Sequence, residues 1–496
     1  MAIGSFALVL HSHLPYCRKS GVWPFGEEWV FEALSETYIP ILDMLMDFRD
    51  RGVIAKVTIG FTPVLLEQIS DPYMLQRFAE YLDMKIAAAC ADMERFRLWR
   101  ETKFLELSEF YRERYLKVKE RFLSRYKGDI VGAFRSLQEA GLVEIVTSAA
   151  THAYLPLLES DFSIYAQLKI GKAVYERFFG TQPRGIWLPE CAYRPEVPAL
   201  TGTGEEVRRG LGSFLEEEGV RFFFVDSHAI EGGVAPSRYA FGHIPMEVRP
   251  EESPPTSHTT FLPYLLKGTK VSVFGRNART GLQVWSEEWG YPGDGNYREF
   301  HKRDSHSGFQ YWKVTHRLLD LESKEVYNPT SALERAKEQA DHFAGIVEEL
   351  ASDFHAETGK HGIVVSPYDI ELFGHWWFEG VDWLRMMLEK LSESRVVELT
   401  LPGEFLEAHP PEESIELGET SWGLGGKHYV WMNPETEWVW DEVHEAERRM
   451  EAALKELASL PPGFPASGPG PSFPEVSTSS NGVQPVHDGP ARPIPE

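Results

Sequence analysis

Two acidic side chains, Glu190 and Asp369, stand in sequence surroundings that suit catalysis. Glu190 belongs to IWLPECAYRP and Asp369 to VVSPYDIELFGHWW, so each follows a short apolar run, lies close to a proline and has aromatic neighbours. Two carboxyl groups that flank a sugar can cleave a glycosidic bond, one as nucleophile or base and the other as acid. Taken alone, either acid could equally lie on the surface or cap a helix. Their matching positions after two separate apolar runs favour a catalytic pair.

Tryptophan is concentrated in or near the same kind of segment, at Trp285, Trp289, Trp376, Trp377, Trp422 and Trp431. The flat apolar face of an indole packs well against the C–H face of a pyranose ring, so these residues favour a sugar ligand. Neither GxxxxGK[ST] nor a GxGxxG after a strand-like run occurs, so the sequence does not indicate a phosphate or dinucleotide site. Most tryptophans in any protein belong to the core, and we predict ligand contacts only for Trp285 and Trp422. His375, in FGHWW, could belong to the site or to the packing.

Histidines offer a second set of candidate site residues. His11 and His13 lie near the end of the first strand-like run, and His152 follows the third. They could donate or accept hydrogen bonds to sugar hydroxyls, or be structural. Alternatively, with Asp226 or His228, they could bind zinc and activate a water molecule. We favour the hydrogen-bonding role and predict no metal.

Short β-rich runs recur along the chain with helical stretches between them. They are Ser5 to Leu10, Val53 to Ile59, Val143 to Thr147, Gly185 to Leu188, Arg221 to Val225, Val271 to Phe274 and Gly362 to Val365. Several are apolar without alternation, which is typical of parallel strands covered on both faces. This pattern predicts an α/β fold, either a parallel barrel or a doubly wound sheet. Nearly every run is followed by a His, Glu, Asp, Arg or Trp, and in a barrel these strand ends would converge on one face.

Composition limits the partners and the compartment. The formal net charge is −25, so a nucleic acid or an anionic membrane would be repelled and a neutral substrate is the simpler expectation. The three cysteines, Cys17, Cys90 and Cys191, do not suggest a disulfide framework and fit a reducing compartment. The opening MAIGSFALVLHSH lacks a basic leader, and no run reaches the roughly 20 apolar residues that span a bilayer. We therefore predict a cytoplasmic protein.

The remaining segments suggest a domain organisation. We predict a catalytic barrel over residues 1–402, with a helical insertion at about 71–140 and a proline-rich lid loop at about 235–264. A helical C-terminal domain should follow over residues 403–460. Residues 461–496 are rich in Pro, Gly and Ser and poor in aliphatic residues, so we expect a disordered tail.

Several longer motifs resemble those of glycoside hydrolase family 57, namely HSHLPY, GFTPVLLEQ, IWLPECAYRP, SPYDIELFGHWW and ETSWGLGGKHYVWMN. TSAATHAYLPLL and QVWSEEWGYPGDGNYREF resemble the subgroup of 1,4-α-glucan branching enzymes. The resemblance covers about residues 4 to 450. It implies a (β/α)7 barrel with an inserted helical domain and a helical C-terminal domain, and a retaining mechanism without a cofactor.

The resemblance also implies roles for individual residues. By match to the family motifs, Glu190 is the nucleophile and Asp369 the proton donor. Substrate-binding or pocket-lining positions correspond to Arg276, Gly293, Trp422, His11, His13, His152 and Tyr239.

The implied reaction is branching of an α-1,4-glucan such as amylose or glycogen, by transfer of a cleaved chain to a 6-hydroxyl. An α-amylase or 4-α-glucanotransferase of the same family is the alternative. Branching relatives usually carry a Ser-Asp-Trp motif in a later helical segment, and no such motif follows the helix that ends at Leu460 in this sequence. The lid from Ala235 to Tyr264 is also longer than the lid of the family. We expect a monomer or a homodimer.

Overall fold

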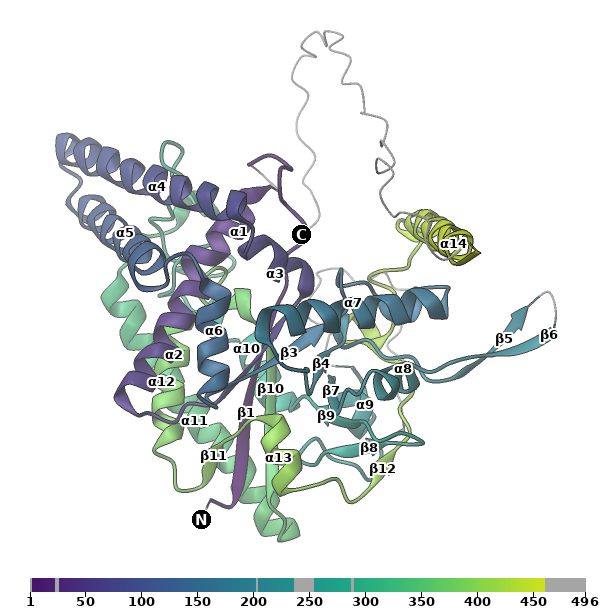
Figure 1. The fold of residues 1–496 in the computed structure, drawn as a ribbon. Helices are drawn as coiled ribbons and strands as arrows, with labels where there is room; N and C mark the ends of the chain where they lie inside the picture. Colours follow the sequence, from purple (N-terminus) through teal and green to yellow (C-terminus); the bar gives the residue numbers. More distant parts are fainter. Residues whose placement is uncertain (1, 23–25, 202–203, 236–253, 287–289, 460–496) are drawn as a thin grey trace. The chain divides into compact units, whose positions relative to one another are not determined.

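The computed structural model describes residues 2–22, 26–201, 204–235, 254–286 and 290–459. It divides into two compact units, Met1–Glu437 and Trp438–Glu496. The first unit holds a parallel sheet surrounded by helices (Figure 1). The second is described through one helix, α14 (Glu437–Ser459). The predicted disordered tail and most of the predicted lid lie outside the described residues.

The sheet is built from the β-rich runs of the sequence. Its main strands are β1 (Gly4–Ser12), β2 (Val57–Phe61), β3 (Val143–Ser148), β4 (Ile186–Trp187), β7 (Phe222–Val225), β9 (Ser272–Gly275) and β10 (Gly362–Asp369). Strands β10, β1, β2, β3 and β4 follow one another in that order, and each neighbouring pair is parallel. Every residue of β1 is buried, as expected of a parallel strand covered on both faces.

The sheet continues past β4 and curls. Gly185, directly before β4, forms a parallel bridge with Phe222 of β7, and β7 pairs in parallel with β9. A side chain at Gly185 would place its Cβ atom 2.3 Å from the Phe222 ring, so only glycine allows this approach. Beyond β9, the amide of Asn277 donates to the carbonyl oxygen of Val365 in β10 at 2.9 Å. One backbone hydrogen bond thus links the chain after β9 to β10, and the predicted parallel α/β fold is confirmed.

Some strand boundaries differ from the sequence-based prediction. The run from Val53 begins its strand only at Val57, because α2 (Ile39–Arg51) is capped by Gly52 in a left-handed conformation and the chain first has to turn. Strand β10 extends four residues beyond Val365 and includes Asp369, which was expected to follow the strand.

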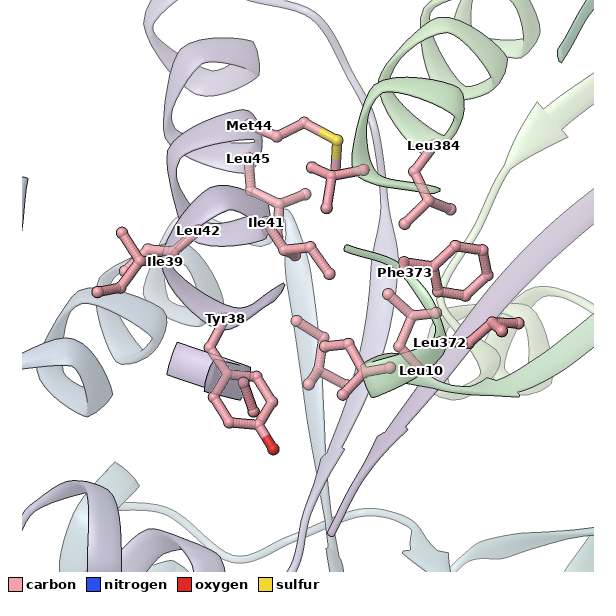
Figure 2. Close-up of a cluster of buried hydrophobic side chains, with 14 of the residues drawn as sticks. Leu10, Tyr38, Ile39, Ile41, Leu42, Met44, Leu45, Leu372, Phe373 and Leu384 are labelled. Atoms are coloured by element: carbon pink, nitrogen blue, oxygen red, sulfur yellow. The ribbon is translucent and has the colours of Figure 1, made fainter. Parts of the chain in front are cut away.

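The two faces of the sheet contribute to different clusters. The inner cluster holds Ala7, Val9, Val146, Trp187, Cys191, Phe222, Phe224, Phe274, Ile363 and Val365, with Phe405 and Leu406 of α13 (Pro402–Ala408). The outer face packs against the helices. Figure 2 shows part of this outer cluster, where Leu10 of β1 and Phe373 meet Ile41 and Leu45 of α2 and Leu384 of α12 (Gly380–Ser392).

Helices fill the connections between the strands. They are α1 (Glu27–Ala33), α2 (Ile39–Arg51), α3 (Pro63–Ile69), α4 (Pro72–Trp99), α5 (Thr102–Glu120), α6 (Ile130–Glu139), α7 (Asp161–Phe179), α8 (Leu211–Glu217), α9 (Ser227–Glu231), α10 (Ala278–Trp285), α11 (Pro329–Thr358), α12 (Gly380–Ser392) and α13. Between β2 and β3, the long helices α4 and α5 pack against each other (Figure 1). The predicted domain boundaries stay predictions. Of the helices described, none has the length and apolar composition to cross a bilayer.

Short strands complete the fold. Strands β5 (Val197–Thr201) and β6 (Gly204–Arg208) form an antiparallel pair. Strand β8 (Tyr264–Leu266) lies antiparallel to β9 and parallel to β12 (Ser414–Ile415), and β11 (Val397–Leu399) lies parallel to β1.

Candidate active site

The inner face of the sheet changes from apolar to polar at the carboxyl ends of the strands. Side chains of a strand alternate between its faces, so the inward column of Ala7 and Val9 in β1 continues with His11. The same two-residue alternation puts three further residues on the inner face, namely Asp226 after β7, Arg276 after β9 and Asp369 in β10. The apolar interior therefore ends in a layer of ionisable groups at one end of the sheet.

Glu190 is held on a strained turn directly after β4. It lies in the short 3-10 turn η4 (Pro189–Cys191), with φ 62° and ψ 24°, a left-handed conformation that non-glycine residues rarely adopt. The Trp422 indole N–H donates to Glu190 Oε2 at 2.7 Å, and the Trp422 amide donates to the Glu190 carbonyl oxygen at 3.0 Å. Burial raises the pKa of Glu190, and the indole N–H opposes that rise. Two hydrogen bonds donated by Trp422 thus fix the backbone and the carboxyl group of Glu190.

Asp369 is the last residue of β10 and pairs in register with His11 of β1. Burial raises its pKa well above the ordinary value, and the neighbouring Glu371 and Glu190 carboxylates raise it further, while Arg276 opposes them. Glu190 therefore lies close enough to Asp369 to disfavour its ionisation. A carboxyl group in this setting favours its protonated form and can act as an acid.

Arg276 and Asp226 form a bidentate ion pair at the same end of the sheet. Arg276 donates from Nε to Asp226 Oδ1 at 3.0 Å and from Nη2 to Oδ2 at 2.7 Å. The guanidinium carbon lies 6.0 Å from the centre of the Trp422 ring. The pair joins the ends of β7 and β9 and places a positive charge near Asp369.

The predicted histidines come together as a stack. His13 and His152 have ring centres 3.8 Å apart, and His11 Nε2 lies 3.0 Å from His152 Nε2. His11 also stacks on Trp187 at 4.7 Å. Burial lowers the pKa of His13 to about 4, and burial together with the neighbouring imidazoles lowers the pKa of His11 and His152 well below the usual range. The rings are therefore neutral at pH 7, and His11 and His152 share a hydrogen bond while His13 stacks on His152.

The geometry of these side chains gives little support to the zinc alternative. Both Asp226 oxygens accept hydrogen bonds from Arg276, and His228 Nε2 lies 2.9 Å from Thr420 Oγ1. Within the described residues, no group of three or more His, Cys, Asp or Glu side chains is arranged to hold a metal ion.

An aromatic cluster lies beside Glu190. Trp422 contacts Trp187 edge to face, with ring centres 5.1 Å apart, and Tyr154 stacks on Trp431 at 4.2 Å. The Tyr154 hydroxyl lies 2.7 Å from His428 Nδ1, and His428 Nε2 lies 2.8 Å from Glu419 Oε1. Tyr154 was not predicted from the sequence, although it belongs to the quoted THAYLP stretch.

Other predicted residues lie apart from this cluster. Trp285 ends α10 and packs, partly buried, against the outer core. Gly293 is exposed and ends the turn η6 (Tyr291–Gly293). In the part of the chain that the structure describes, no hydrogen bond joins either residue to Glu190 or Asp369. Tyr239 and Trp289 lie outside the described residues.

The FGHWW stretch mainly serves packing. His375 is 3% exposed, and its Nδ1 lies 3.0 Å from Glu36 Oε2. Trp377 is 1% exposed and packs against Phe373 and Trp383, whereas Trp376 is 43% exposed.

Sequence reasoning missed one buried acid. Glu371, two residues after Asp369, lies in the 3-10 turn η8 (Ile370–Leu372) and accepts hydrogen bonds from the Tyr38 hydroxyl and from the His13 amide. Its residue type alone does not distinguish it from a surface acid. The only signal in the sequence is its position two residues after Asp369.

Comparison with known proteins adds an independent line of support. The chain matches the glycosyl hydrolase family 57 profile over residues 7–418. A 1,4-alpha-glucan branching enzyme of Thermococcus kodakarensis is 47% identical over 456 residues, which cover 92% of this chain and 65% of the relative. This chain thus spans less than two thirds of that relative's length.

Solved structures agree with the sequence comparison. A crystal structure of the family 57 branching enzyme of the same archaeon, in complex with glucose and additives, matches with a TM-score of 0.81 at 46% identity, covering 90% of this chain and 79% of that one. An α-amylase of Thermotoga maritima matches with a TM-score of 0.74 at 30% identity, covering 92% and 83%. The motifs, the curled parallel sheet and these matches agree, and the chain belongs to glycosyl hydrolase family 57.

Proposed function

We propose that this protein is a 1,4-alpha-glucan branching enzyme. The observation that carries the proposal is the 47% identity, over 92% of the chain, to a protein named as such an enzyme. The substrate would be an α-1,4-glucan such as amylose or glycogen. We further propose a cytoplasmic place in glycogen synthesis, and a monomer or homodimer as the working form.

In the first step, Glu190 attacks the anomeric carbon while Asp369 protonates the departing glucosidic oxygen. The Trp422 indole N–H at 2.7 Å from Glu190 Oε2 orients the attacking carboxylate. Burial and the neighbouring carboxylates raise the pKa of Asp369, so this group carries the proton that the leaving oxygen needs. The result is a covalent glycosyl-enzyme on Glu190.

In the second step, a 6-hydroxyl of another glucan chain displaces Glu190 and forms an α-1,6 branch. Esterification removes the Glu190 charge, which is one of the causes of the raised Asp369 pKa, so that pKa falls and Asp369 can accept the hydroxyl proton. Two displacements at one carbon retain its configuration. Neither step needs a cofactor.

The other predicted residues would bind the glucan around these two acids. We propose substrate contacts for His11, His13, His152, Arg276 and Trp422, whose side chains are clustered near the strand ends. Trp285, Gly293 and Tyr239 stay candidates on sequence grounds.

A hydrolase is the second candidate, because the α-amylase of Thermotoga maritima is also similar, at 30% identity and a TM-score of 0.74. Both activities share the glycosyl-enzyme and differ in whether water or a sugar hydroxyl reaches it.

Incubation of amylose with the protein separates the two. A branching enzyme should generate α-1,6 linkages, counted by proton NMR, without a matching increase in reducing ends. New reducing ends without α-1,6 linkages would identify a hydrolase, and altered chain lengths with neither would identify 4-to-4 transfer.

The role of Glu190 is tested with Glu190→Gln. Because the amide is a poor nucleophile of similar shape, we expect turnover of amylose to fall about 10⁴-fold or more, while retardation in amylose-containing native gels persists. Glu407→Gln, on a side chain 57% exposed, is the control and should keep full turnover. Comparable turnover by the two variants would remove Glu190 as nucleophile.

A further inference from the structure

A second buried carboxyl lies in the short turn that follows the candidate acid Asp369. Glu371 is 4% exposed and follows Asp369 by two residues. Its Oε1 accepts a hydrogen bond from the His13 amide at 3.1 Å and another from the Tyr38 hydroxyl. One side chain thereby joins the turn after β10 to the end of β1 and to the connection between α1 and α2.

The Tyr38 contact comes from an irregular helical segment. Tyr38 is 0% exposed and ends η1 (Leu34–Tyr38), a π-helical turn inserted between α1 and α2. Such turns are rare and are found frequently at functional sites. Burial raises the pKa of the Tyr38 phenol well above the ordinary value, and Glu371 and then Asp369 raise it further. The hydroxyl donates to Glu371, and Asp369 lies near enough to act on the phenol.

The charges around Asp369 come from several elements. Glu371 of η8 and Glu190 of η4 disfavour its ionisation, and Arg276 after β9 favours it. His11 of β1, its partner in register, is neutral at pH 7 because burial lowers its pKa. Burial raises the pKa of Glu371 itself to about 7, against the opposing Tyr38 and His13 hydrogen bonds. Two interacting carboxyls of this kind cannot both lose their protons at low cost.

We propose that Glu371 is a positioning residue for Asp369: it ties the end of β10 to His13 and Tyr38, and its charge keeps the proton on Asp369 until the glucosidic bond breaks. The inference rests on the proposed role of Asp369 as acid and base. Glu371 itself contacts no reacting atom in this scheme. Its effect should appear in the pH dependence of cleavage, which a purely structural residue would not shift.

Glu371→Gln tests the charge while leaving an amide oxygen to accept from Tyr38 and His13. Loss of the charge should lower the pKa of Asp369, so the basic limb of the kcat/KM profile should move to lower pH by about 1 unit. Cleavage is scored as total α-1,4 bonds lost, whether the product is a branch or a reducing end. Tyr38→Phe removes a hydrogen bond that favours the Glu371 charge and should shift the limb in the same direction by less.

Glu379→Gln is the matched control. Like Glu371, Glu379 is buried, at 3% exposed, lies on the connection between β10 and α12, and has a pKa that burial raises to about 7. Unlike Glu371, it accepts a hydrogen bond from the Arg298 amide at 3.1 Å and does not act on Asp369. Its profile should match that of the unchanged protein. The inference is overturned if the two Glu371 and Tyr38 variants keep the original profile, or if Glu379→Gln shifts it equally. Absence of any α-1,4 cleavage by the unchanged protein would instead overturn the proposed function, and this inference with it.

Discussion

Individual hydrogen bonds at the carboxyl ends of the strands decide how each acid is used. Glu190 receives the Trp422 indole N–H at 2.7 Å, whereas the carboxylates of Glu371 and Glu190 act on Asp369. Burial raises the pKa of both groups, but the indole N–H opposes that rise at Glu190, whereas the two carboxylates add to it at Asp369. Two side chains of similar chemistry are thereby separated into a candidate nucleophile and a candidate acid.

Trp422→Phe tests this separation. The ring is kept but the N–H is lost, so the pKa of Glu190 should rise and the acidic limb of the kcat/KM profile should move to higher pH. Loss of a hydrogen bond to a charged group costs about 1.5 to 3 kcal/mol, so kcat/KM should fall about 10- to 100-fold. Trp377→Phe is the control, because the buried Trp377 indole N–H has no partner among the described residues. An acidic limb that stays in place in Trp422→Phe would contradict the assignment.

At the scale of elements, a buried ionic network holds the segment that follows β10. Arg298 Nη1 donates to Glu36 Oε1 at 3.0 Å, and Arg298 Nη2 donates to the His375 carbonyl oxygen at 3.2 Å. The Arg298 guanidinium also lies 3.9 Å from the centre of the Phe378 ring. Burial alone would raise the pKa of Glu36, but Arg298 and His375 more than offset this and hold it well below the ordinary range. Arg298 thereby connects η1, which carries Tyr38, to the FGHWW stretch through Glu36 and His375.

Arg298→Met should strongly destabilise the fold, because the buried Glu36 carboxylate would lose its guanidinium partner and keep only His375. We expect a loss of about 3 to 5 kcal/mol in the free energy of unfolding, measured by urea denaturation. Arg335→Met is the control: its guanidinium is 41% exposed and pairs with Asp294 at 2.7 Å, so its loss should cost less than about 1 kcal/mol. Equal losses for the two variants would mean that burial of the Glu36 pair contributes nothing.

Over the whole molecule, buried carboxyls make stability depend on pH. Burial raises the pKa of Glu371 and of Glu379 to about 7 from an ordinary value of 4.5. Between these values the folded protein keeps protons that the unfolded chain releases, so stability should fall as the pH rises through this window.

Glu379→Gln isolates one such contribution, since the amide does not titrate. Relative to the unchanged protein, the variant should gain about 3 kcal/mol in unfolding free energy between pH 5 and pH 8. Urea denaturation at the two pH values measures the difference. Glu407→Gln, at an exposed position, should show the same difference at both pH values. A pH-independent effect of Glu379→Gln would show that this carboxyl ionises normally in the fold.

Much of the sheet could be predicted because parallel strands buried on both faces leave a strong local signal. Each β-rich run became a strand, although the run from Val53 starts late and β10 runs on to Asp369. Glu190 and Asp369 were conspicuous because they follow such runs. Glu371 and Tyr154 could not be recognised, since their importance lies in contacts with residues far along the chain.

The sequence by itself determined the strands and the family and singled out the two candidate acids, because strand periodicity and ordered motifs are properties of neighbouring residues. The tertiary structure decided which groups face those acids. Trp422 reaches Glu190 across 232 positions, and Tyr38 reaches Glu371 across 333. Such contacts depend on strand order, register and the curl of the sheet, and these are settled only when the whole chain packs.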